Sequence, residues 1–133
     1  MDWLAFVGVV VASTIACSFT DWLFMGIMFH GRYRATPDTW RSLDKGGERA
    51  KIILSTLIGG VASAAFAYLL VRIGAVDYRP VLCWAVVVWL AGPAAVVAIN
   101  ALWVRMDYRL AVSHSIGWLA RLVVTGLITA ALM

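Results

Sequence analysis

The chain has 133 residues, of which 63% are hydrophobic and 14% charged, and its net charge at neutral pH is +4. Since charged residues normally supply about a quarter of a soluble domain, this composition excludes a soluble globular protein and indicates an integral membrane protein. We expect a single transmembrane domain over residues 1–133, because a chain of this length leaves no room for a separate catalytic or nucleotide-binding domain.

Apolar segments long enough to cross a bilayer occupy nearly the whole chain. A helix needs about 20 apolar residues to span about 30 Å of hydrocarbon, and the runs lack the alternating polarity of a β-barrel. Because the connections after the second and third runs are short, neighbouring helices must be antiparallel. The sequence therefore predicts an all-α, integral membrane four-helix bundle with spans at about 3–29, 52–76, 81–103 and 111–133.

The basic residues predict the orientation of these spans. Most of them lie in the loop over residues 30–51 or in the third connection, whereas Arg72 and Arg79 lie near the second connection. The positive-inside rule then predicts an N-out, C-out, multi-pass protein of the cytoplasmic (inner) membrane. The net charge follows from this topology, so we expect no nucleic-acid partner. The basic residues on the predicted cytoplasmic side are Arg32, Arg34, Arg41, Lys45, Arg49, Lys51, Arg105 and Arg109.

The loop over residues 30–51 contains a signal for a short interfacial helix. Thr36 is a good N-cap, Pro37 suits the first helical position, and Gly46-Gly47 would end the helix. The basic residues of the loop indicate membrane lipids as partners.

Two ionisable residues lie at matching depths inside predicted spans. Asp21 is about eight residues, or roughly 12 Å, from the cytoplasmic end of the first span, and Arg121 is about ten residues, or roughly 15 Å, from that end of the last. A charged side chain at mid-bilayer costs on the order of 2.5 to 3.5 kcal/mol on insertion scales. Since the first and last helices of a small bundle are commonly neighbours, we expect Asp21 and Arg121 to form an ion pair.

Other polar residues are expected to gather around this pair. The spacing of His114, Trp118, Arg121 and Thr125 places them on one helix face, and Asn100 lies one turn inside the cytoplasmic boundary of the third span. Two interpretations remain open: a hydrogen-bond network that fixes the helix order, or a site for a proton, an ion or a small polar ligand. The candidate ligand-binding residues are Asp21, Asn100, His114, Trp118 and Arg121.

The second and third spans carry signals for packing. Small residues recur every four positions in the second span, which permits close approach of another helix, either within the bundle or in a homodimer. In the third span, Gly92-Pro93 predicts a kink, since proline removes a backbone donor. The small-residue face consists of Ser55, Gly59, Ser63 and Ala67.

No motif in the sequence indicates a reaction, so we expect no catalytic residue, no cofactor and no metal site. The two histidines, His30 and His114, are too few for a metal site, and Cys17 and Cys83 do not form a Cys-x-x-Cys pair. We expect the cysteines to be packing residues.

Three function classes remain. The preferred one is a non-enzymatic membrane protein whose inner-leaflet polar cluster binds a small ligand or a lipid headgroup. A dimeric small transporter with Asp21 as its membrane-embedded acid is the alternative, although pairing with Arg121 would oppose protonation of that acid. The second alternative is an intramembrane enzyme, for which only weak pairings such as Ser18 or Cys17 with Asp21 lie at matched depth.

Aromatic and glycine residues at particular places in the spans resemble a known family. They are Trp3, the segment Trp22-Leu23-Phe24 with Gly26, Trp84 and Trp89, and His114 with Trp118 one turn on. In these features the chain resembles the small bacterial membrane proteins of domain of unknown function family 1761. The resemblance implies a four-helix membrane protein and brings no activity.

Overall fold

The structure, a computed structural model, is helical over nearly all of the residues that it describes, 2–31 and 45–133, with residues 45–48 described in backbone only. A first long helix continues without interruption into a π-helical segment, and a second π-helical segment separates two parts of the third membrane span. The elements are α1 (Trp3–Asp21), η1 (Trp22–Met28), α3 (Lys45–Arg72), α4 (Tyr78–Trp89), η2 (Leu90–Ala94), α5 (Ala95–Trp103) and α6 (Tyr108–Leu132).

Within the described residues, 4 helical stretches are long and apolar enough to cross a membrane. Their mean hydropathy lies between 1.6 and 2.3, and large apolar side chains point outward along all of them, as lipid surroundings require. The prediction of an all-α bundle with four apolar spans is confirmed. The observed stretches are Trp3–Met28, Arg49–Arg72, Tyr78–Trp103 and Tyr108–Leu132.

The helix ends differ from the predicted ones because capping residues fix them. Asp107 accepts a hydrogen bond from the backbone N–H of Arg109 at 2.8 Å, so α6 begins three residues before the predicted start at 111. Pro80 lies in the first turn of α4, where backbone N–H groups have no intrahelical acceptor, so the missing N–H of proline costs no hydrogen bond. This helix also begins earlier than predicted, at Tyr78.

A glycine ends α3 four residues before the predicted boundary at 76. Gly74 has a φ of +70°, and the N–H groups of Gly74 and Ala75 donate to the carbonyls of Val71 and Leu70. These two bonds form a Schellman motif, with Ala75 packed close to Leu70 in the apolar core.

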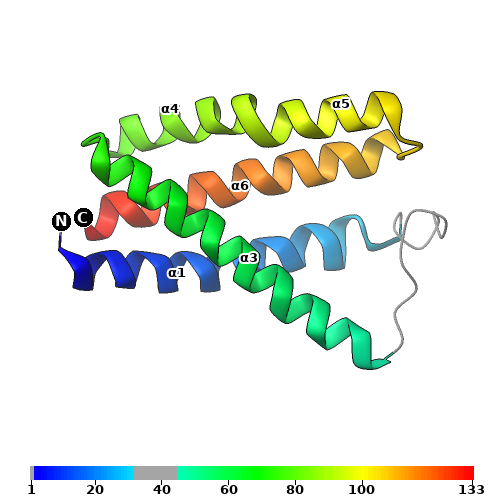
Figure 1. Cartoon of the computed structure of the whole chain (residues 1–133), viewed down its shortest axis with the longest axis horizontal. Coiled ribbons are helices and arrows are strands. Elements are labelled where there is room, and N and C mark those ends of the chain that lie inside the picture. The colour runs from blue at the N-terminus through cyan, green and yellow to red at the C-terminus, as the bar shows by residue number, and fades with distance from the viewer. Residues whose placement is uncertain (1, 32–44) are drawn as a thin grey trace.

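Helix α6 lies at the centre of the bundle. It packs against α1 on one side and against α4 and α5 on the other, while α3 crosses over α1 and α6 (Figure 1). The apolar core lies at the end of the bundle that holds the N and C termini. Its buried members are Phe66, Leu70, Ala75, Val81, Ala85 and Leu122.

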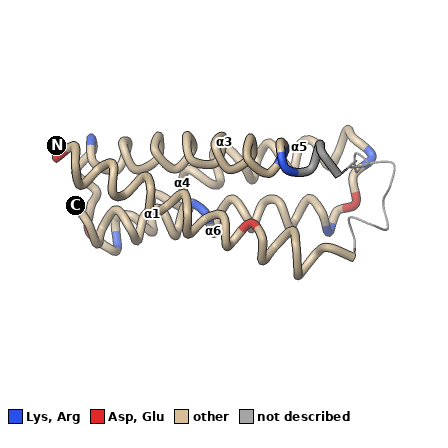
Figure 2. Tube along the Cα trace, turned by 90° about the horizontal axis from the view of Figure 1, so that it is seen from below, with Lys and Arg blue, Asp and Glu red and all other residues tan. Residues whose placement is uncertain are grey.

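The opposite end of the bundle is more open. The N-terminal half of α3 diverges from α1 and η1 toward this end, so the first and second spans separate there (Figure 1). Charged residues gather toward the two ends of the bundle, and the tube between them is mostly uncharged (Figure 2). The exceptions include the pair described below.

Two predictions about helix breaks have different outcomes. At Pro93 the regular α-helix is interrupted by the π-helical segment η2. The predicted kink is not a sharp bend, because α4 and α5 run in nearly the same direction on either side of η2 (Figure 1). The predicted helix end at Gly46-Gly47 is wrong, because both glycines lie inside α3, which begins at Lys45. The rest of the predicted interfacial helix, from Thr36, lies outside the described residues.

Candidate functional site

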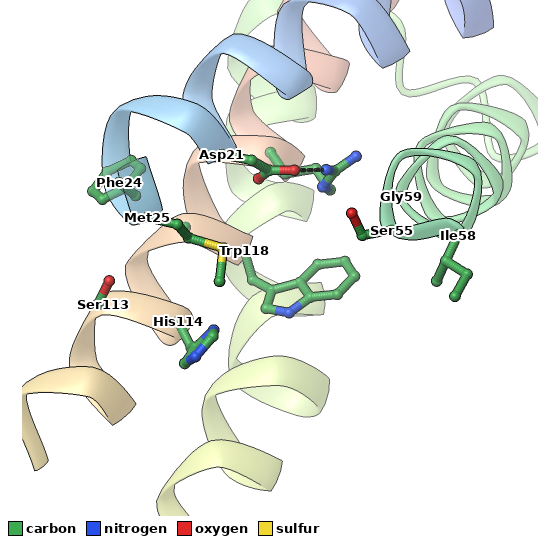
Figure 3. Close-up of a pocket in the computed structure, with 11 residues that line it drawn as sticks. Asp21, Phe24, Met25, Ser55, Ile58, Gly59, Ser113, His114 and Trp118 are labelled. Atoms are coloured by element: carbon green, nitrogen blue, oxygen red, sulfur yellow. Dashed lines mark hydrogen bonds and ion pairs between the residues drawn. The ribbon is translucent and has the colours of Figure 1, made fainter. Parts of the chain in front are cut away.

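An ion pair between α1 and α6 forms the centre of the candidate site (Figure 3). The Nη2 group of Arg121 donates to Oδ2 of Asp21, and Nη1 donates to the hydroxyl of Ser63 on α3 at 3.5 Å. The partners differ in exposure, since the Arg121 side chain is 6% exposed and the Asp21 side chain 40%. The ion pair expected from the sequence is therefore present, with the guanidinium inside the bundle and the carboxylate at its edge.

The guanidinium of Arg121 lies directly against α3 at Gly59. A Cβ atom at residue 59 would be 2.6 Å from both terminal nitrogens of Arg121, so a glycine is needed to leave room for the charged group. On the α6 side, Cζ of Arg121 is 5.8 Å from the centroid of the Trp118 ring, within the range of a cation–π interaction. Residues from α1, α3 and α6 thus enclose the positive charge.

Hydrogen bonds continue from the ion pair into the interior of the bundle. The hydroxyl of Thr125 donates to that of Ser63 at 3.2 Å, and the Cys17 thiol donates to the carbonyl oxygen of Arg121 at 3.7 Å. Cys17, Ser63 and Thr125 are all buried. This network joins α1, α3 and α6, and hydrogen bonds between membrane helices are of the kind that can fix helix order.

A cleft lies on the other side of the ion pair, between η1, the N-terminal half of α3, and α6. Its volume is about 240 Å³. Figure 3 shows the Met25 side chain directed toward the ring of Trp118, with Asp21 above them and His114 below. Residues that line the cleft include Asp21, Phe24 and Met25 from the first span, Ser55 and Gly59 from α3, and Ser113, His114, Gly117 and Trp118 from α6.

A π-helical turn brings the residues after Asp21 to this cleft. In η1 the hydrogen bonds reach back five residues, as shown by the bond from the N–H of Phe29 to the carbonyl of Phe24 at 3.0 Å. Both Phe24 and Met25 then line the cleft together with Asp21. Single π-helical turns of this kind occur frequently at functional sites.

Two small residues of α6 leave the cleft incompletely filled. Ser113 lines it and is 1% exposed, yet its hydroxyl has no hydrogen-bond partner within the described part of the chain. Gly117 also lines it, and a Cβ atom there would meet nothing within 4 Å. An unpaired buried hydroxyl typically costs about 1 to 3 kcal/mol.

Four of the five candidate residues predicted from the sequence come together in this structure. Asp21, His114, Trp118 and Arg121 all line the cleft. Asn100 does not, because it lies exposed on α5, and α6 separates α5 from α1 and α3 (Figure 1). Depth in the membrane placed Asn100 near the pair, but depth alone does not tell which side of α6 a residue faces.

The small-residue face of α3 is used inside the chain. Gly59, Ser63 and Ala67 are buried, whereas Ser55 is exposed. Gly60 beside this face also approaches α1 closely, since a Cβ there would be 3.0 Å from the Thr14 hydroxyl. The close approach that these residues allow therefore serves the contacts of α3 with α1 and α6.

Several residues of the cleft and of its ion pair are not among the candidate ligand-binding residues predicted from the sequence. Gly59 and Ser63 were visible as part of a packing stripe, and their small size was the signal for a close neighbour. Met25, Ser113 and Gly117 gave no signal, because their role depends on how far α3 diverges from the first span.

The cleft combines polar and apolar groups. Its lining includes one carboxylate, one guanidinium, hydroxyl and imidazole groups, a thioether and aromatic rings. Over residues 2–31 and 45–133, no group of three or more His, Cys, Asp or Glu residues is arranged to hold a metal ion. The arrangement is suited to a ligand that has both a polar and an apolar part.

Comparison with known proteins connects this four-helix architecture to a family. No curated protein and no solved structure matches the chain. The family model described as a protein of unknown function, DUF1761, matches residues 8–130, from the first turns of α1 almost to the end of α6. The match reaches all 4 of the apolar helical stretches described above and includes both partners of the ion pair, so the chain belongs to the DUF1761 family.

Proposed function

We propose that this chain is a non-enzymatic, multi-pass protein of the cytoplasmic (inner) membrane that binds the polar part of a small ligand or a lipid headgroup beside Asp21. The observation that carries the proposal is the carboxylate of Asp21, which is 40% exposed and lines a cleft of about 240 Å³ inside a membrane span. An ion pair with a purely structural role would be better shielded from lipid. An open carboxylate next to unfilled volume favours binding.

The shape of the bundle supports entry of a ligand from within the bilayer. The first span and the N-terminal half of α3 separate toward one end of the bundle (Figure 1), and residues of α6 complete the lining of the cleft. Ile58 of α3, an exposed apolar residue, is one of the residues that line this cleft. An amphipathic molecule would place its polar head in the cleft while its apolar part remained in lipid.

The charge distribution supports a cytoplasmic position for the open end of the bundle. The two termini lie together at the other end (Figure 1), while Arg105 and Arg109 flank the start of α6 near the opening.

We expect alkaline phosphatase fused after Met133 to be active and green fluorescent protein fused there to be dark in a bacterial host, because the positive-inside rule places the C-terminus outside. If the green fluorescent protein fusion were fluorescent and the alkaline phosphatase fusion inactive, the C-terminus would be inside and this orientation would be contradicted.

The cleft-filling substitution Gly117→Phe tests the proposed function. Because Gly117 lines the cleft and a Cβ at residue 117 meets no atom within 4 Å, a phenylalanine side chain there would extend into the cleft. We expect native mass spectrometry of the protein, released from membranes in mild detergent, to show a bound mass on wild type and about tenfold less of it on Gly117→Phe.

Gly8→Phe is the matched control for this experiment. Gly8 is exposed on α1, and a Cβ there also meets nothing within 4 Å, but the residue is not part of the cleft. The control should keep the bound mass of wild type. Equal bound mass on both variants, or no bound mass on wild type, would refute the proposed function.

A further inference from the structure

The ion pair presents its negative end to the cleft. The guanidinium of Arg121 is 6% exposed, donates to Asp21 and Ser63, and has Gly59 against it, so it has little surface for another partner. The Asp21 side chain is 40% exposed, and the structure gives it no hydrogen-bond partner other than Arg121 within the described residues. A molecule that enters the cleft therefore meets a carboxylate oxygen first.

This arrangement selects for the sign of the ligand's charge. An anionic group near Asp21 would face a like charge, with the compensating guanidinium behind it. A cationic donor would form a charge-assisted hydrogen bond or a close ion contact with the free carboxylate oxygen.

The walls of the cleft suit an organic cation better than a metal ion. Met25 and Trp118 provide a polarisable thioether and an aromatic ring beside Asp21 (Figure 3), and such groups attract the methyl or methylene groups around an ammonium nitrogen. The cleft volume of about 240 Å³ is smaller than the roughly 300 to 1,000 Å³ of pockets that hold drug-sized ligands. This is room for a headgroup and not for a large molecule.

We propose that the cleft binds an organic ammonium group attached to an apolar body, with Asp21 as the acceptor. This inference rests on the proposed function and gives its ligand a chemical class. The ammonium could belong to the headgroup of phosphatidylethanolamine or to a free amphipathic amine, and the experiment below separates these two sources.

The test uses two small aromatic probes of opposite charge, and two lipids. Benzyltrimethylammonium is compared with benzenesulfonate by titration calorimetry in detergent, and phosphatidylethanolamine with phosphatidylglycerol of identical chains by native mass spectrometry. We expect the ammonium member to bind in at least one of the two comparisons. Binding of the lipid alone identifies a headgroup site, and binding of the free ammonium identifies an amine site.

Variants of the ion pair separate the role of each charge. Arg121→Met should keep or strengthen ammonium binding, since the carboxylate remains. Adding Asp21→Leu to that variant should weaken binding by about tenfold or more. Comparing the double variant with Arg121→Met, each checked for its helical circular dichroism, isolates the effect of the carboxylate.

The outcomes distinguish this inference from the proposed function. If benzenesulfonate or phosphatidylglycerol binds and Gly117→Phe blocks it, the cleft is a binding site but the ligand is not a cation. If the probes and lipids bind equally to wild type and Gly117→Phe, the cleft is not the site and both ideas fail.

Discussion

Asp21→Leu should lower the free energy of unfolding by about 3 kcal/mol or more, and adding Arg121→Met should restore most of that loss. The single substitution leaves a guanidinium that is 6% exposed with Ser63 as its remaining side-chain acceptor. Breaking a buried pair by removing one partner typically costs about 3 to 5 kcal/mol, whereas replacing both partners with apolar residues is often neutral. The measurement is reversible unfolding in mixed detergent micelles, followed by circular dichroism.

The two single substitutions, Asp21→Leu and Arg121→Met, should lower the free energy of unfolding by unequal amounts. Arg121→Met leaves behind a carboxylate that is 40% exposed and that the open cleft allows to be solvated, so we expect a loss of about 1 to 2 kcal/mol. Asp77→Asn serves as a control, because Asp77 precedes α4 without a side-chain capping bond and should have little effect. A double variant no more stable than Asp21→Leu would mean that the pair is not energetically coupled.

Most of the fold could be predicted from the sequence because hydrophobic length is a strong local signal. The same holds for the ion pair, since Asp21 and Arg121 lie at similar depths and a membrane leaves few other partners for either. The positions of His114 and Trp118 followed from helical periodicity relative to Arg121. In these cases a residue's depth and helix face were sufficient to predict its neighbours.

The remaining features depend on how the helices are arranged around one another. Asn100 has the predicted depth but lies on α5, on the other side of α6 from the cleft. The opening of the cleft results from the divergence of α3 and from the π-helical turn after Asp21, and neither has a reliable signal in a single sequence. Gly59 was recognised as a packing residue, whereas its neighbour, a charged side chain, could not be identified without the structure.

The effect of Gly59→Ala on the free energy of unfolding should change sign with the residue at position 121. In the wild-type background, the new Cβ would be 2.6 Å from both terminal nitrogens of Arg121. The guanidinium would have to move away from Asp21 and Ser63, and we expect the free energy of unfolding to fall by about 2 kcal/mol. In the double variant Asp21→Leu and Arg121→Met, the charged group is gone. Alanine's greater helix propensity should then stabilise the protein by up to about 1 kcal/mol.

This reversal would show that Gly59 is required by the charge that it contacts and not by helix packing in general. Gly8→Ala is the matched control, because its Cβ meets nothing within 4 Å and its effect should be small and the same in both backgrounds. Unfolding in mixed micelles again provides the measurement. Equal destabilisation by Gly59→Ala in both backgrounds would instead mean that α3 cannot tolerate a methyl group at this crossing, whatever residue lies opposite.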